Sequence, residues 1–163
     1  MNIIIYIGIA GFLICLFIMY ATPHGIPGLR KFEANFRLLD MRFCYSETEI
    51  NETFSRLGVE GRKAYKNYWL LDYVFIVCFL IVQLVIVRAF NMSGIVSWCL
   101  IGLVLLRALF DCIENSILLF LINCYPVRKK WLAKLSSYST SCKFVSLYIW
   151  LAGIAGMILY MLL

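Results

Sequence analysis

The stretch Leu105–Leu121, LLRALFDCIENSILLFL, decides how this chain must fold. It is apolar enough to cross a membrane, yet it contains Arg107, Asp111, Glu114 and Asn115. On a helix that turns by about 100° per residue, these side chains fall within an arc of about 100°. Placing a single ionisable group of this kind in hydrocarbon costs at least ~2.5 kcal/mol. Other segments of the chain must therefore supply polar partners for this face.

The composition of the whole chain indicates an integral membrane protein. Its 163 residues are 63% hydrophobic and have a mean hydropathy of +0.88, whereas soluble domains are about 45–50% apolar. The formal net charge of +6 does not indicate nucleic-acid binding, because most of the basic residues lie in two loops between apolar runs. We therefore expect one all-α transmembrane domain over residues 1–163, with no nucleic-acid partner.

Four apolar runs are long enough to be membrane spans. We expect these spans at about 3–21, 68–89, 96–125 and 136–162. The first run lacks the basic start of a signal peptide, so we interpret it as an uncleaved transmembrane helix. A tight turn is expected at 91–94. The sequence GIAG occurs at 8–11 and again at 153–156, and its glycines would let the first and last spans pack closely.

The polar segment at 22–67 separates the first two spans and contains eight basic and six acidic residues. Ser46 is followed three positions later by Glu49, which is typical of a helix capping box. A single apolar stripe follows, and Gly58 marks the expected stop. We expect a short amphipathic helix at about 47–57, lying on the membrane surface or on the bundle and able to act as a lid. The alternative is a solvated linker.

The distribution of Lys and Arg predicts the orientation of the four-helix bundle. The segments 22–67 and 126–135 carry eight and four basic residues, the connection between the second and third spans has at most Arg88, and both termini have none. By the positive-inside rule, the two basic segments face the cytoplasm and both termini face outside. A short, Ile- and Cys-rich chain is compatible with the inner (plasma) membrane of a bacterium, which we expect as its location.

Seven cysteines and one histidine are present, but their spacing does not predict a site for chemistry. No C-x-x-C pair occurs, which a thiol oxidoreductase would need. His24 has no cysteine or histidine cluster around it, so neither zinc nor haem is expected. We interpret the cysteines as small hydrophobic packing residues, and we expect no cofactor and no metal.

Depth along the helix axes predicts that the polar faces of the last three spans meet. At 1.5 Å per residue, the ionisable side chains fall in the cytoplasmic half of the bilayer or one turn deeper. They are Asp72, Arg107, Asp111, Glu114 and Lys143. Three carboxylates face two cations, so one negative charge is left over if all of them ionise. We expect a retained proton, a cationic ligand or a nearby cation such as Arg62 to compensate it.

Several short motifs extend this pattern and resemble a widespread group of small four-helix membrane proteins. The group's pattern contains LG-x-x-GR-x-x-Y, an aspartate early in the next span, D-x-x-EN in the span after it, and T-x-x-K in the last. The matching positions are Tyr45, Leu57, Gly58, Gly61, Arg62, Tyr65, Asp72, Asp111, Glu114, Asn115, Thr140 and Lys143. The resemblance covers residues from about 39 to 150. It implies the four-helix fold and a shared set of polar positions, and it implies no substrate, since the group has no settled biochemical role.

The leading functional hypothesis is a cytoplasm-facing polar pocket that binds a small amphiphile or an ion. Its candidate residues are Arg62, Tyr65, Asp72, Arg107, Asp111, Glu114, Asn115, Thr140 and Lys143. Arg62 and Lys143 would neutralise an anionic head group, while Asp111 and Glu114 would hydrogen-bond to it or exchange a proton. Two alternatives stay open. One is an enzyme that acts on a lipid or isoprenoid with carboxylate acid/base chemistry, and the other is a non-catalytic accessory subunit. Membrane lipids are the expected partners, and the sequence identifies no protein partner.

Overall fold

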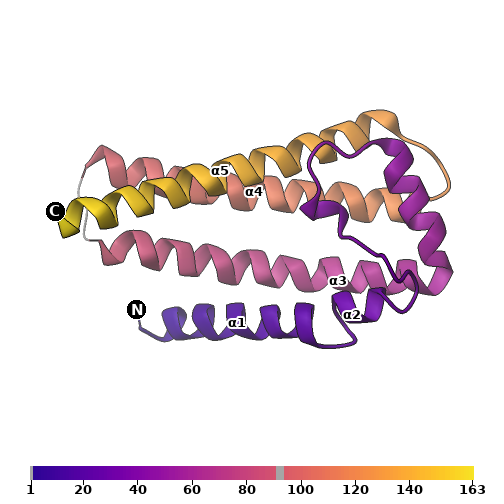
Figure 1. Ribbon diagram of the computed structural model, residues 1–163, viewed down its shortest axis with the longest axis horizontal. Helices are drawn as coiled ribbons and strands as arrows, with labels where there is room; N and C mark the ends of the chain where they lie inside the picture. The colour runs from indigo at the N-terminus through magenta and orange to yellow at the C-terminus, as the bar shows by residue number, and fades with distance from the viewer. Residues whose placement is uncertain (1, 91–93) are drawn as a thin grey trace.

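The computed structural model describes residues 2–90 and 94–163, and all regular secondary structure in these residues is helical. Four long helices run side by side (Figure 1), namely α1 (Asn2–Ala21), α3 (Glu47–Ala89), α4 (Ile95–Cys124) and α5 (Lys130–Leu162). Each is long and apolar enough to cross a membrane. This confirms the prediction of an all-α bundle of four long apolar helices. The turn predicted at 91–94 lies, apart from Gly94, outside the described residues.

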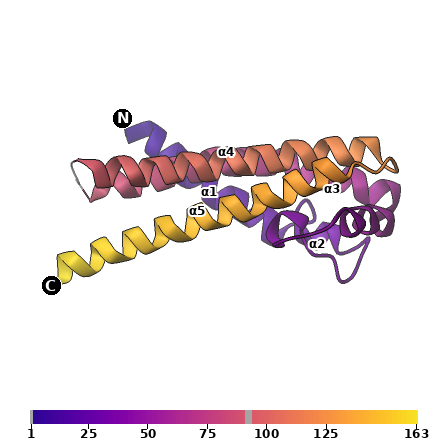
Figure 2. The same cartoon turned by 90° about the horizontal axis from the view of Figure 1, so that it is seen from above.

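The connection between α1 and α3 contains two short helices, α2 (Ile26–Leu29) and the 3-10 helix η1 (Leu39–Met41). This connection lies at one end of the bundle, and both chain ends lie at the opposite end (Figure 1). The helices pack in sequence, because α1 contacts α3, α3 contacts α4, and α4 contacts α5. α5 crosses α4 at an angle, so the two helices diverge toward the C-terminus (Figure 2).

The GIAG segments do not bring the first and last helices together, so that prediction is wrong. Gly8 and Gly11 of α1 lie against Ile81 and Cys78 of α3, where an added Cβ would clash with the facing side chain. Gly153 of α5 lies against α4 instead. Gly8, Gly11 and Gly153 allow close approach, whereas Gly156 has open space beside it, and the two segments meet different neighbours because α1 and α5 lie on opposite sides of the bundle (Figure 1).

α3 begins with the predicted capping box and is bent at Gly58. The Ser46 hydroxyl accepts a hydrogen bond from the Glu49 N–H at 3.2 Å, and the Glu49 carboxylate accepts one from the Ser46 N–H at 2.7 Å. Gly58 has φ 65° and ψ −171°, which a residue with a Cβ rarely adopts. Arg62 donates to the Phe54 carbonyl at 2.9 Å and so supplies a donor beside the bend. Residues 47–57 therefore form the first helical segment of α3, with Ile50, Phe54 and Leu57 buried, and this segment ends at the kink at Gly58, where the sequence predicted a stop.

Two apolar clusters fix where the polar residues lie along the bundle. One cluster, at the end that carries the connection, includes Phe54, Trp69 and Leu118. The other, nearer the chain ends, includes Val104 and Trp150. On α3, α4 and α5 the buried charged residues come between these two clusters. Along the bundle axis, packed apolar side chains therefore lie on both sides of the polar cluster.

Candidate functional site

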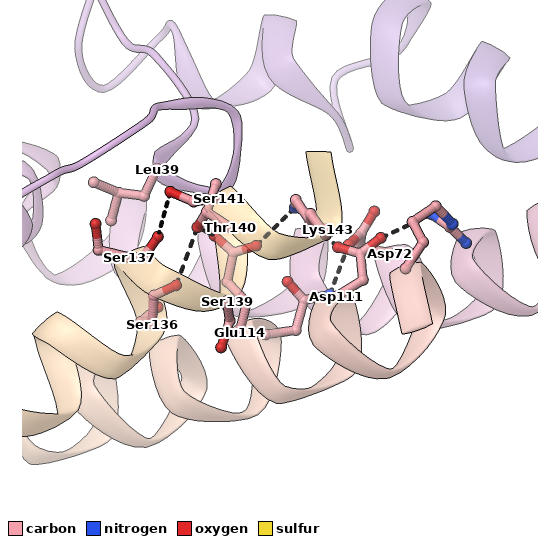
Figure 3. A network of polar contacts seen from close by, with 12 residues as sticks. Leu39, Asp72, Asp111, Glu114, Ser136, Ser137, Ser139, Thr140, Ser141 and Lys143 are labelled. Carbon is pink, nitrogen blue, oxygen red and sulfur yellow. Dashed lines mark hydrogen bonds and ion pairs between the residues drawn. The ribbon is translucent and has the colours of Figure 1, made fainter. Parts of the chain in front are cut away.

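Lys143 of α5 lies between two acidic side chains of α4 (Figure 3). Its Nζ is 2.9 Å from Asp111 Oδ1 and 2.7 Å from Glu114 Oε2. Arg107, one turn along α4, donates from Nη1 to Asp111 Oδ2 at 3.0 Å. None of these four side chains belongs to a residue that is more than 6% exposed. Lys143 is thus shared by the two carboxylates and links α5 to α4, while Arg107 pairs with Asp111 within α4.

Glu114 is also held by neutral donors from two other segments. The Tyr45 hydroxyl donates to Glu114 Oε1 at 3.1 Å and lies 2.5 Å from Ser136 Oγ. The Thr140 hydroxyl donates to the same Glu114 oxygen. Burial, followed by the nearby Glu114 charge, raises the pKa of the Tyr45 hydroxyl well above its ordinary value, so this group stays protonated and acts as a donor. We call Tyr45, Glu114, Ser136 and Thr140, together with Lys143, the Glu114 group.

Asp72 of α3 has a simpler environment. The Asn115 side chain of α4 donates from Nδ2 to Asp72 Oδ2 at 2.6 Å, and both residues are buried. This hydrogen bond joins α3 to α4. In the described part of the chain, no basic side chain lies within ion-pair distance of Asp72. Its charge therefore has an amide donor but no counter-ion.

Asp40 reaches the same region from η1 in the connection between α1 and α3. The Tyr65 hydroxyl accepts a hydrogen bond from the Leu39 N–H at 2.9 Å, which holds η1 against α3. Asp40 is only 4% exposed, and among the described residues its Oδ1 has no hydrogen-bond partner. Burial raises the pKa of this carboxyl, and the positive charge of Lys143 acts against that rise. We call Asp40 and Asp72 the open carboxylates.

The open carboxylates line a cavity of ≈ 180 Å³ between the four long helices and η1. Its polar side chains are Asp40, Asp72, Arg107, Asp111 and Lys143. Most of the remaining wall is apolar or aromatic, and consists of Leu16, Met19, Tyr20, Leu38, Met41, Tyr68, Phe75, Phe79, Phe144 and Leu147. Tyr20 and Met41 are 58% and 54% exposed, so they mark the mouth. The cavity therefore has a charged end and an apolar wall.

The structure brings seven of the nine candidate residues into one connected cluster. They are Asp72, Arg107, Asp111, Glu114, Asn115, Thr140 and Lys143. The other two lie elsewhere. Arg62 is used at the bend of α3, where its guanidinium also lies 4.6 Å from the Tyr125 ring centroid. Tyr65 holds η1 and does not line the cavity.

Three residues of the cluster, Asp40, Tyr45 and Ser136, were missing from the predicted set. Asp40 is a lone acid within the apolar run LLDM at 38–41, and that pattern could have indicated a buried carboxylate. Tyr45 belongs to the pattern of the resembling group, which did not assign it a partner. The covering segment also differs from the expected lid, because the cavity is lined by residues of 38–41 and by none of 47–57.

The cluster can stabilise a charge or exchange a proton, and its carboxylates can accept hydrogen bonds from a ligand. Within residues 2–90 and 94–163, no group of three or more His, Cys, Asp or Glu side chains is placed to hold a metal ion. In comparisons with known proteins, no family model, no curated protein and no solved structure matches this chain. The resemblance to the four-helix group therefore depends on the motifs alone.

Proposed function

We propose that this protein binds a small amphiphile in the cavity between the four long helices and η1. The single observation that carries the proposal is a cavity of ≈ 180 Å³ with charged side chains at one end and an apolar wall beside them. A ligand with one polar and one apolar part matches such a lining, because each part meets groups of its own kind. An engineered cavity of about 150 Å³ holds benzene, so the space suits a head group with a short length of chain.

The mouth of the cavity supports the same proposal. Tyr20 of α1 and Met41 of η1 are the exposed members of the lining. In a membrane, an apolar chain longer than the cavity can leave between them toward the acyl chains. The charged end stays buried, since none of its five polar residues is more than 6% exposed. This arrangement holds a head group inside the bundle while leaving the tail in lipid.

The orientation proposed with this function places the connection between α1 and α3 on the cytoplasmic side. Its eight basic residues and the four at 126–135 support that side by the positive-inside rule. The first part of α3, 47–57, would then lie at the cytoplasmic surface of the bundle. Cys44 in this connection is an exposed free thiol. A membrane-impermeant maleimide should give a labelled band in inverted vesicles that Cys44→Ser abolishes. Because Cys99 and Cys142 are also exposed free thiols, only labelling of intact cells that Cys44→Ser abolishes would reverse the orientation.

A purely structural role is favoured by one observation, the pairing of the Glu114 charge within the protein. Glu114 accepts two hydrogen bonds at Oε1 and forms an ion pair with Lys143 at Oε2, which has no hydrogen-bond partner among the described residues, and Glu114 does not line the cavity. This side of the cluster resembles the polar contacts that hold transmembrane helices together. The lining of the cavity by Asp40 and Asp72 is what favours ligand binding over structure alone. No observation specifically favours catalysis on a lipid or isoprenoid.

Filling the cavity tests the proposal. Leu147 of α5 lines the cavity, and Leu147→Trp should occupy part of its volume. Val145→Trp on the same helix is the matched control, because Val145 is 53% exposed and is not part of the lining. Each protein is purified from membranes in a mild detergent, and its bound small molecules are measured by native mass spectrometry. The wild type and the control should carry an amphiphile that Leu147→Trp has lost.

An equal amount of the same molecule on all three proteins would show that the cavity does not hold it. The unfolding of each variant in rising SDS serves as the stability readout, because overpacking a core costs about 1–3 kcal/mol. A loss of bound amphiphile at unchanged stability supports the proposal directly. Wild-type protein that carries no amphiphile, from native membranes or after incubation with a lipid extract, would contradict it.

A further inference from the structure

We propose that the head group held in this cavity is a cation, and that Asp40 and Asp72 recognise it. The inference rests on the proposed function, because it specifies the charge of the ligand in the same cavity. The expected ligands are therefore amphiphiles with an ammonium group, either a primary amine or a quaternary amine. The sequence pattern left both signs open, an anionic head group on Arg62 and Lys143 or a cationic ligand that balances the extra carboxylate.

The charges of both basic residues of the cavity are already paired, although the Nε of Arg107 has no hydrogen-bond partner among the described residues. Lys143 has an acidic partner on each side, at 2.9 Å and 2.7 Å, and Arg107 is paired with Asp111 at 3.0 Å. The Arg107 guanidinium also lies 4.4 Å from the Phe79 ring centroid. Apart from the single N–H at Arg107 Nε, an anionic head group would have to displace these carboxylates to reach the cations. Breaking buried ion pairs is costly, so the cavity is unfavourable for an anion.

The acidic residues of the cavity are only partly occupied. Asp40 is 96% buried, being 4% exposed, lines the cavity, and its Oδ1 has no hydrogen-bond partner among the described residues. Asp72 has one donor, the Asn115 amide. A buried polar atom without a partner is costly. A cationic ligand in the cavity would supply the donor or counter-charge that both carboxylates lack.

The balance of charge in the cavity also favours a cationic ligand. With Asp40 added to the three predicted carboxylates, four acidic side chains surround two cations in this region. If all six ionise, two negative charges are left over. A bound cation lowers this imbalance without disturbing the existing ion pairs. A neutral ligand leaves the imbalance unchanged.

Aromatic side chains complete the lining. Tyr20, Tyr68, Phe75 and Phe144 stand around the cavity together with Phe79. The faces of aromatic rings attract cations within about 6 Å, and quaternary ammonium groups are recognised in this way. The same rings also pack against a methylene chain. Carboxylates beside aromatic walls therefore suit an alkylammonium better than an alkyl alcohol.

Three probes with the same chain and different charge test this inference, namely decyltrimethylammonium, decanol and decyl sulfate. Each is titrated calorimetrically into the full-length protein in nanodiscs of zwitterionic lipid, with empty nanodiscs as the blank. The ammonium probe should bind at least about tenfold more tightly than the sulfate, which corresponds to about 1.4 kcal/mol. Its permanent charge makes the comparison independent of probe protonation. No variant is required for this first comparison.

Substitutions then assign the recognition to the open carboxylates. Asp40→Asn and Asp72→Asn should each weaken ammonium binding by about tenfold and leave decanol binding unchanged. Glu60→Gln is the control, because Glu60 is exposed and pairs with Lys63 away from the cavity. If Asp40→Asn does not fold, Asp72→Asn and the wild-type probe series still decide the question.

Two different failures are distinguishable. If decyl sulfate or decanol binds as tightly as the ammonium, and Leu147→Trp abolishes that binding, the cavity is the site but the cationic head group is wrong. If no probe binds in a way that depends on Leu147, the proposed function fails together with this inference. Tight ammonium binding that is unaffected by both aspartate substitutions also overturns the assignment to Asp40 and Asp72.

Discussion

The Glu114 group and the open carboxylates lie a few side chains apart in one polar cluster, but they differ in how completely they are paired. Glu114 Oε1 accepts hydrogen bonds from Tyr45 and Thr140, and its Oε2 forms an ion pair with Lys143 but has no hydrogen-bond partner among the described residues. Asp72 has one amide donor, and the Oδ1 of Asp40 has none among the described residues. Both open carboxylates line the cavity, whereas of the Glu114 group Lys143 lines it and Glu114 does not.

The difference separates stability from binding within one set of buried charges. A carboxylate whose partners come from the protein itself stabilises the helix packing and has little left to offer a ligand. A carboxylate that lacks partners raises the free energy of the folded state, and it persists where another requirement maintains it. The predictions below test this division, since removing a group from one side should affect stability and removing one from the other should affect binding.

The largest effect is expected for Lys143→Met. This substitution leaves Asp111 and Glu114 buried without their shared ammonium, and breaking a buried pair in this way costs about 3–5 kcal/mol. The control is Lys134→Met, because Lys134 is exposed on the same helix. The free energy of unfolding is measured by SDS titration in mixed micelles. A loss no larger than that of the control would show that the Glu114 group does not hold the bundle together.

A smaller loss in the free energy of unfolding is expected for Tyr45→Phe. The change removes the hydroxyl that joins Glu114 to Ser136, and it leaves buried oxygen atoms with fewer partners, at a cost of about 1–3 kcal/mol. Tyr138→Phe is the matched control on an exposed tyrosine. The same unfolding titration gives the difference. Equal stability of the two variants would indicate that water replaces the hydroxyl and that the group is less closed than its contacts suggest.

Asp72→Asn should change stability by less than about 1 kcal/mol, because polar contacts between transmembrane helices contribute about 0.6 kcal/mol on average and an unpaired charge is removed at the same time. The matched substitution Glu114→Gln should cost more, since it breaks an ion pair with Lys143. Comparing the two variants under one set of conditions sharpens the division directly. Equal losses would remove the distinction between the two sides.

The smallest effect is a pH dependence that belongs to Asp40. Burial raises its pKa above the ordinary value of 3.8, so the folded chain retains a proton that the unfolded chain has lost. The contribution of Asp40 to the free energy of unfolding therefore falls as the pH rises from about 3.8 to the folded pKa, and it is constant above that. The ionisable groups around it are Tyr20, Tyr65, Tyr68, Asp72, Arg107, Asp111 and Lys143.

Asparagine does not titrate, so the Asp40→Asn variant lacks this pH dependence. Its free energy of unfolding relative to that of the wild type should therefore increase as the pH rises from about 3.8 to the folded pKa of Asp40. The measurement is the SDS unfolding titration repeated at several pH values, with Glu60→Gln as the exposed control. Wild-type and Asp40→Asn curves that stay parallel across the window would show that the Asp40 pKa is the same in the folded and unfolded chain.

Local pattern was sufficient for much of the fold. The lengths of the apolar runs predicted the four long helices, and the spacing of Ser46 and Glu49 predicted the start of α3. The spacing of the polar residues on α4 predicted that they share a face, and the cost of leaving them in lipid predicted that partners exist. These inferences depend on helix geometry and on the cost of placing a single polar group in lipid, and both follow from residue type and spacing in the sequence.

The partners of each helix were harder to predict. GIAG indicates a surface that permits close approach, but it carries no information on which helix approaches, and the two copies meet different neighbours. Arg62 was expected beside the polar cluster because of its charge and sequence position. It is drawn instead to the Phe54 carbonyl, which the bend at Gly58 leaves in need of a donor.

The sequence by itself determined that this chain forms four long apolar helices and that the charged face of α4 must be paired. Both follow from the cost of exposing polar groups to hydrocarbon, which depends on residue type and helical spacing. Only the tertiary structure decided that η1 carries Asp40 into the bundle and that the cavity faces the open carboxylates, while Glu114 is enclosed by its partners. Those outcomes depend on contacts between residues far apart in the chain, since a side chain's unpaired atoms are defined by what surrounds them and not by its neighbours in sequence.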